Sequence, residues 1–126
     1  MRVLLDSRVL IWWDSGVRLR AEAVGAIRDA DQVFVSAVSG WEVAIKAALG
    51  RLRLTRTVAE AAEESGFEEL PLRLTHGDVL ADLPMHHRDP FDRMLIAQAI
   101  AEKLTVLTRD SWFTKYRVKV VKVVKA

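Results

Sequence analysis

The 126-residue sequence predicts an α/β fold in which helices cover both faces of a mainly parallel sheet. Short apolar segments alternate along the chain with longer segments of helical periodicity. The first two short segments, residues 2–5 and 32–36, are mostly apolar rather than alternating, as expected for strands with both faces covered. There is no repeat, linker or low-complexity segment, so we expect residues 1–126 to form a single domain.

Each predicted element has a local signal in the sequence. Apolar runs of strand length cover residues 2–5, 32–36, 67–72, 104–108 and 116–124. A first helical pattern begins at residues 9–13. Further helical patterns cover residues 19–30, 39–50, 57–66, 75–84 and 90–103. Two of these helical patterns end at a glycine, Gly50 and Gly66, which favours helix termination. Lysines in the last predicted strand indicate that it lies at an exposed edge of the sheet.

The composition limits the classes of function. A hydrophobic fraction of 51% is enough for a buried core, and the formal net charge of +2 permits a polyanionic partner without requiring one. The absence of cysteine excludes disulfides, thiolate metal sites and cysteine nucleophiles. An acid at the sixth residue is incompatible with a signal peptide, and no apolar run reaches the roughly 18 residues of a membrane span. We therefore expect a cytoplasmic protein.

The segment HRDPFDRMLIAQA, residues 87–99, places two acids at the start of an apolar helix. Asp89 is suited to the N-cap, Pro90 to the first helical position and Asp92 to the positively polarised first turn, so local structure alone could explain both acids. Asp92 also extends an apolar helical face, which contains Leu95, Ile96, Ala99 and Ile100. Its carboxylate should therefore point into the protein, where it needs a cation or several hydrogen-bond donors.

Two further acids follow predicted strands. Asp6 comes directly after residues 2–5, and Asp110 comes shortly after residues 104–108. Ligands of open parallel sheets bind beyond the carboxyl ends of the strands, so the two carboxylates would share one crevice if these strands are neighbours. The structural alternative is that Asp6 caps the first helix and Asp110 caps the following turn.

Glu42 is the fourth candidate. We place it at the edge of the apolar stripe of its helix, which comprises Val38, Trp41, Ile45 and Leu49. Two structural alternatives compete with a site role. Ser39 and Glu42 match a capping box, and Glu42 could pair with Lys46 one turn later.

Four carboxylates in one crevice would repel one another and raise their pKa values until some became protonated. A divalent cation removes this repulsion, and a set of oxygen ligands suits Mg²⁺ or Mn²⁺ rather than zinc. Two such ions could stabilise the attacking and leaving oxygens of a phosphodiester. The acids therefore predict metal-dependent hydrolysis.

Other candidate residues receive structural interpretations. His86 and His87 are adjacent in a loop without a third nitrogen or sulfur ligand at a zinc spacing, so we expect a loop role or packing near the site. His76 is expected on the surface of its helix. Three tryptophans are expected to pack rather than to stack on bases: Trp12, Trp13 and Trp41.

Several motifs together resemble the VapC-type PIN-domain ribonuclease toxins of type II toxin–antitoxin systems. They are VLLDS, LIWW, VSAVSGWEVAIKAALGRLRL, ELPL, LPMHHRDPFDRMLIAQA and LTVLTRD, in this order along nearly the whole chain. The combination of DPFDR, LIAQA and TRD is specific, whereas LLD alone would not be.

This resemblance implies a PIN-like three-layer α/β/α sandwich and an endoribonuclease that requires Mg²⁺ or Mn²⁺. Residue by residue, it assigns the catalytic and metal-binding acids to Asp6, Glu42, Asp92 and Asp110. It also implies an RNA substrate, a cognate VapB-type antitoxin and a homodimer.

Three further residues carry expectations from the resemblance or from their positions. Ser7 supplies the hydroxyl that follows the first aspartate in this family and could orient a carboxylate or bind a metal-bound water. Arg93 could contact the substrate phosphate or brace a carboxylate, but a structural role in support of the site is the favoured interpretation. Arg8 stands where many relatives have histidine, which leaves the acids intact but changes the substrate contacts.

Other functions remain open at the level of sequence. The same fold could bind RNA or a protein without cleavage, although binding would not require all four acids. A nuclease acting on structured DNA is also possible, because two-metal chemistry does not select the sugar. A phospho-receiver domain is disfavoured because Asp6 lacks an acidic neighbour and no suitable lysine follows residues 104–108.

Overall fold

The computed structural model describes residues 1–123. Its strands are β1 (Arg2–Leu5), β2 (Gln32–Ser36), β3 (Glu68–Leu70), β4 (Thr105–Thr108) and β5 (Val120–Lys122). Its α-helices are α1 (Ser7–Asp14), α2 (Ala21–Asp29), α3 (Ala37–Ala48), α4 (Val58–Glu64), α5 (Leu74–Ala81) and α6 (Pro90–Glu102). A 3₁₀ helix, η1 (Ser111–Lys115), follows β4. None of the helices within residues 1–123 combines the length and apolar character needed to cross a bilayer.

The five strands form one sheet in the order β3-β2-β1-β4-β5, and every neighbouring pair is parallel. The predicted parallel sheet is therefore confirmed. From β1 the chain adds strands first on one side, through β2 and β3, and later on the other, through β4 and β5. This reversal lies between β1 and β4, so the crevice expected for a ligand lies beyond the carboxyl ends of these two strands.

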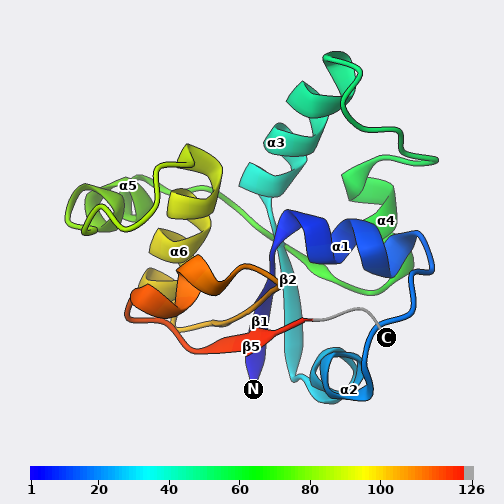
Figure 1. Ribbon diagram of the computed structural model, residues 1–126, viewed down its shortest axis with the longest axis horizontal. Coiled ribbons are helices and arrows are strands. Elements are labelled where there is room, and N and C mark those ends of the chain that lie inside the picture. The colour runs from blue at the N-terminus through cyan, green and yellow to red at the C-terminus, as the bar shows by residue number, and fades with distance from the viewer. Residues whose placement is uncertain (124–126) are drawn as a thin grey trace.

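Helices cover both faces of the sheet, which gives the predicted three-layer α/β/α arrangement (Figure 1). Helices α1, α2 and α4 pack on the face that carries Val3, Leu5 and Val35. Helix α6 packs on the face that carries Leu4 and Val106, and α5 lies along the outer side of α6 (Figure 1). Helix α3 extends beyond the carboxyl end of β2, between these two layers (Figure 1).

The last strand is shorter than the sequence predicts. The predicted strand spans residues 116–124, but the ladder of β5 begins only at Val120, and residue 124 lies outside the described residues. β5 pairs with β4 and forms one edge of the sheet. Lys119 and Lys122 are exposed there, which agrees with the predicted role of lysines at a sheet edge.

The prediction that His76 lies on the surface is wrong, because its side chain is completely buried between α5 and α6. Its Nδ1 accepts a hydrogen bond from the Arg73 backbone N–H (3.0 Å), and its Nε2 lies 3.0 Å from a Glu102 carboxylate oxygen. Next to it, the amide oxygen of the buried Gln98 accepts from the Ser36 hydroxyl at 2.5 Å. A buried polar network therefore joins α5, α6 and the end of β2.

Substitution of His76 by alanine is expected to lower the free energy of unfolding by about 2–4 kcal/mol, because it leaves a cavity and removes two hydrogen bonds. Urea denaturation followed by circular dichroism measures this change. Thr75→Ala, at the exposed neighbouring position, is the control and should change stability by less than about 0.5 kcal/mol. Equal effects of the two substitutions would contradict a structural role for the network.

Candidate active site

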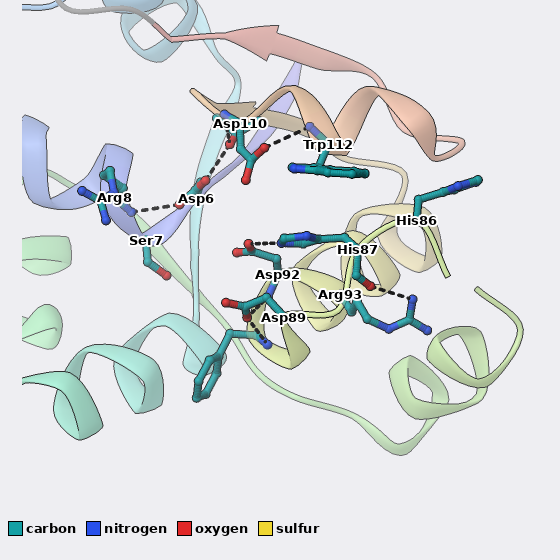
Figure 2. Close-up of polar contacts among 12 residues, drawn as sticks. Asp6, Ser7, Arg8, His86, His87, Asp89, Asp92, Arg93, Asp110 and Trp112 are labelled. Carbon is teal, nitrogen blue, oxygen red and sulfur yellow. Dashed lines mark hydrogen bonds and ion pairs between the residues drawn. The ribbon is translucent and has the colours of Figure 1, made fainter. Parts of the chain in front are cut away.

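A cavity of about 220 Å³ opens at the carboxyl ends of β1 and β4, where the topology places the crevice. Its polar lining includes five carboxylates from four segments of the chain: Asp6, Glu42, Asp89 with Asp92, and Asp110. Figure 2 shows the side chains of Asp6, Asp92 and Asp110 directed toward a common space. The structure thus brings together all four acids that the sequence nominates, and it adds Asp89.

Asp6 and Asp110 are joined by the buried hydroxyl of Thr108, the last residue of β4. The Thr108 hydroxyl donates to Asp6 Oδ2 at 2.6 Å and accepts from the Asp110 backbone N–H at 3.0 Å. Asp6 also caps α1 by accepting from the Arg8 N–H at 2.9 Å, and Asp110 caps η1 by accepting from the Trp112 N–H at 3.0 Å. Asp6 and Asp110 therefore both cap a helix and line the cavity, and the capping hydrogen bonds fix the orientation of their carboxylates.

Glu42 lies on the buried face of α3, with only 6% of its surface exposed. One carboxylate oxygen accepts from the Ser7 hydroxyl at 2.8 Å, and the other pairs with Lys46 Nζ at 2.5 Å. The predicted pair with Lys46 is confirmed. The predicted capping box is wrong, because α3 begins earlier and the N-cap is Ser36, whose hydroxyl accepts from the Val38 N–H.

Most of the apolar stripe of α3 does not face the core: only Val38 is buried there. Trp41 and Leu49 are 60% and 62% exposed, and Ile45 lies at the margin of exposure, whereas Ser39 and Glu42 are buried. The physical reason is the position of α3 beyond the end of the sheet, where the side that faces α1 and α6 lines the acid cavity. Helical periodicity alone selects the apolar face and therefore placed the buried face incorrectly.

Asp92 occupies the first turn of α6, and its side chain is 18% exposed. The predicted N-cap at Asp89 is confirmed, since its carboxylate accepts from the Phe91 N–H at 2.8 Å and the Asp92 N–H at 3.2 Å. Asp92 Oδ2 lies 2.8 Å from His87 Nε2 (Figure 2). The prediction that Asp92 points into the protein is therefore confirmed.

Burial raises the pKa of the Asp92 carboxyl to about 7. The hydrogen bond from His87 opposes this rise, and the charges of Asp6, Asp89 and Glu42 add to it. The pKa of Asp6 is also raised above its ordinary value, again mainly by burial. Loss of solvation therefore contributes more than the like-charge repulsion expected from the sequence, and both effects disfavour charged carboxylates in a cavity without a cation.

A family model for the PIN domain matches residues 3–119, which is most of the chain. The chain belongs to the PIN-domain family. This PIN domain is 29% identical over 119 residues to Ribonuclease VapC22 of Mycobacterium tuberculosis, an alignment that covers 91% of this chain and 92% of the relative. The resemblance to VapC-type PIN proteins inferred from the motifs is thereby confirmed.

Solved structures share the fold of this PIN domain. It resembles VapBC2 from Rickettsia felis bound to a promoter DNA fragment, with a TM-score of 0.67 and 10% identity over 98% of this chain and 100% of that chain. It also resembles FitAcB from Neisseria gonorrhoeae, with a TM-score of 0.64 and 23% identity over 95% and 96% of the two chains. The predicted PIN-like fold is confirmed.

The donors in the cavity of this PIN domain fit a divalent cation. Carboxylates that follow β1 and β4, and carboxylates on α3 and at the start of α6, line this cavity, and burial raises the pKa values of two of them, Asp6 and Asp92. Oxygen-rich sites of this kind suit Mg²⁺ or Mn²⁺. The hydroxyl of Ser7 and the ammonium group of Lys46 hold Glu42 in place at this site.

The sequence predicts a loop role or packing near the site for His87, and the structure places its ring against one of the site acids, Asp92. Besides its contact with Asp92, the His87 ring stacks on Trp112 with a centroid distance of 5.7 Å and an interplanar angle of 17°. His86 turns the other way and packs edge-on against Tyr116 (Figure 2). One signal in the sequence could have indicated this position. His87 precedes Asp92 by five residues, and a turn before Pro90 can bring such a loop residue back over the first turn of the helix.

Within residues 1–123, Arg93 contacts no carboxylate. Its guanidinium group points away from the acids and donates to the backbone oxygens of Pro84 (3.0 Å) and His87 (3.4 Å) (Figure 2). The Tyr116 hydroxyl accepts from the backbone N–H groups of His86 (3.1 Å) and His87 (2.9 Å). In the structure Arg93 therefore fixes the loop that carries His87.

Basic side chains also line the acid cavity. Arg8, Lys46 and Arg109 contribute to its wall, and the Arg109 guanidinium group lies 5.7 Å from the centroid of the Trp12 ring. Trp12 and Trp13 pack against the core, as predicted, whereas Trp41 contacts Phe91 edge-on and stays largely exposed. The cavity therefore combines acids at its centre with cations able to contact a polyanion.

Proposed function

We propose that this PIN domain is a metal-dependent endoribonuclease and the toxin of a VapBC-type toxin–antitoxin pair, acting in the cytoplasm. Its catalytic, metal-binding residues are Asp6, Glu42, Asp92 and Asp110. The observation that carries the proposal is the meeting of these four acids, from four separate segments, in one cavity at the switch point of the sheet. The relative named Ribonuclease VapC22 supports RNA as the substrate.

The side chains have distinct roles in this proposal. Bound Mg²⁺ or Mn²⁺ would lower the pKa of a water and neutralise charge that develops on the leaving oxygen. Thr108 and Ser7 orient the carboxylates of Asp6 and Glu42 by donating hydrogen bonds to them. Arg8 and Arg109 lie where they can attract the phosphates that flank the cleaved bond. The products are a 3′-hydroxyl and a 5′-phosphate, as the family resemblance implies.

A groove beside the acid cavity suits the cognate antitoxin. It has a volume of about 890 Å³, lies between α3, α4 and the segment that joins them, and has a mainly apolar lining. Val43 and Leu52 line both this groove and the acid cavity. An extended or helical segment of a VapB-type antitoxin could therefore follow the groove and place a basic side chain among the carboxylates, which would block RNA.

The exposed apolar stripe of α3 supports the predicted homodimer. Trp41, Ile45 and Leu49 form this stripe, and none of them lines the cavity. Large exposed apolar side chains arranged along one helix are typical of protein interfaces. We propose that a second copy of this PIN domain covers the stripe.

Incubation with total cellular RNA tests the proposed activity. Chain purified free of any partner should yield discrete fragments in Mg²⁺ or Mn²⁺ and none in EDTA. Glu42→Gln should reduce the rate by at least about 100-fold, because it weakens the metal site. Glu63→Gln, at an exposed position of α4, is the matched control and should cleave at the wild-type rate.

The same assay separates the alternatives. Equal cleavage by wild type and Glu42→Gln would show that the activity arises elsewhere. RNA binding without cleavage in any metal would favour the non-cleaving binding module. Cleavage of structured DNA with no cleavage of RNA would assign the four acids to a DNA nuclease.

A further inference from the structure

The His87 ring is held in a defined position at the edge of the acid cavity. Its Nε2 lies 2.8 Å from Asp92 Oδ2, and its ring stacks on Trp112. Its backbone N–H donates to the Tyr116 hydroxyl at 2.9 Å, and its backbone oxygen accepts from Arg93 at 3.4 Å. Side chains from α6, from η1 and from the residue after η1 therefore fix both the ring and the backbone of His87.

His87 also lies within ligand distance of two carboxylates. One ring nitrogen of His87, one oxygen of Asp92 and one oxygen of Asp110 all lie within 4.8 Å of one another. Bonds of about 2.0–2.2 Å to one ion would separate two opposed ligand atoms by about 4.2 Å. Only small side-chain movements would therefore let these three groups bind a single ion.

The cavity and its edge thus offer two kinds of donor. Asp6 and Glu42, with Ser7, offer oxygen atoms alone. On the other side, His87 adds a nitrogen to the oxygens of Asp92 and Asp110. Mg²⁺ strongly prefers oxygen ligands and keeps its water, whereas imidazole is an ordinary ligand for first-row transition ions.

We propose that His87 is a nitrogen ligand of a cation shared with Asp92 and Asp110, and that it makes the cavity prefer Mn²⁺ to Mg²⁺. This inference rests on the proposed function only in requiring a divalent cation at the acid cavity. Coordination uses the Nε2 lone pair, so the neutral ring carries its proton on Nδ1. A positioning role is the competing explanation, in which the Nε2–H donates to Asp92 and never touches the ion.

Electron spin-echo measurements on Mn²⁺ bound to the full chain, without RNA, distinguish these two roles. A coordinated imidazole nitrogen modulates the Mn²⁺ echo at ¹⁴N frequencies. We expect this ¹⁴N modulation in the wild type and in His86→Ala, and its loss in His87→Ala. His86 is a matched control, because it is the adjacent histidine and packs on Tyr116 rather than facing the acids.

Titration calorimetry supplies the second readout. His87→Ala should weaken Mn²⁺ binding by about 10-fold or more, the scale typical of changes around a metal site, and Mg²⁺ binding by less than about 2-fold. His86→Ala should leave both affinities unchanged. Circular dichroism of each variant establishes that it is folded, and the ¹⁴N modulation of the wild type needs no variant.

Two outcomes would overturn the assignment of His87. One is a wild-type Mn²⁺ complex without ¹⁴N modulation, and the other is an equal loss of Mn²⁺ and Mg²⁺ affinity in His87→Ala. RNA cleavage in either case would leave the proposed function intact. Conversely, ¹⁴N modulation in a protein that cleaves no RNA would support His87 as a ligand and contradict the ribonuclease function.

Discussion

Asp92→Asn is expected to abolish RNA cleavage and, at the same time, to raise the unfolding temperature of the metal-free protein at pH 8. The Asp92 carboxyl is largely buried, and burial raises its pKa to about 7, so its charged form destabilises the fold when no cation is bound. Asparagine is neutral and nearly isosteric, and its side-chain oxygen can still accept from His87. The substitution thus removes the charge that destabilises the metal-free fold and also a proposed metal ligand.

The expected magnitudes are large enough to measure. Cleavage should fall by at least about 100-fold. A pKa difference of about three units would correspond to roughly 4 kcal/mol, and relaxation of the site reduces the expected gain in stability to about 1–2 kcal/mol, or several degrees. Thermal unfolding in EDTA measures this gain. Asp78→Asn, at an exposed position of α5, is the control and should change neither property.

A metal-free Asp92→Asn protein that unfolds below the wild type at pH 8 would show that the charged carboxylate is well compensated in the cavity. Full cleavage by this variant would remove Asp92 from the active site. The two readouts are independent, because the first concerns the folded protein without metal and the second concerns catalysis.

Several acids could be predicted from the sequence because their signals are local. Asp6 and Asp110 follow strands, and Asp89 precedes a proline at the start of a helix. The rule that parallel strands present their carboxyl ends at one edge then brings the first two together without knowledge of any distance. The structure confirms this step by placing β1 beside β4.

Interactions between distant segments could not be predicted in the same way. His76 is buried because Glu102, 26 residues later, lies beside it when α5 packs on α6. The face of α3 that carries Ser39 and Glu42 is buried together with Val43, because this face lines the cavity and packs toward its neighbours, whereas periodicity reports only where apolar residues gather. Glu42 was therefore nominated for the site, but its helical face was assigned incorrectly.

The contribution of Asp92 to the free energy of unfolding of the metal-free protein is expected to decrease as pH rises from about 4 to about 7. In this range the unfolded chain has already released the Asp92 proton, whereas the folded chain, with a pKa of about 7, still holds it. The folded state therefore binds more protons, and its stability decreases until both states are ionised. The raised pKa of Asp6 acts in the same direction.

A divalent cation should reverse this loss at pH 8, where the carboxylates are charged and bind it without releasing protons. At pH 5 the same concentration of Mn²⁺ should stabilise the protein much less, because protons must first leave the ligands. Unfolding in urea at pH 5 and pH 8, with EDTA or Mn²⁺, measures the four stabilities. Asp92→Asn isolates the contribution of Asp92, since the difference between wild type and variant cancels every other titrating group that is independent of it.

In EDTA, the wild type should lose stability relative to Asp92→Asn when the pH is raised from 5 to 8. At pH 8, Mn²⁺ should stabilise the wild type far more strongly than it stabilises Asp92→Asn. A difference between the two proteins that stays constant with pH would mean that Asp92 titrates normally in the folded chain. Equal stabilisation of both proteins by Mn²⁺ would place the bound cation away from Asp92. In either case the acid cavity would no longer explain both the pH dependence of stability and the proposed chemistry.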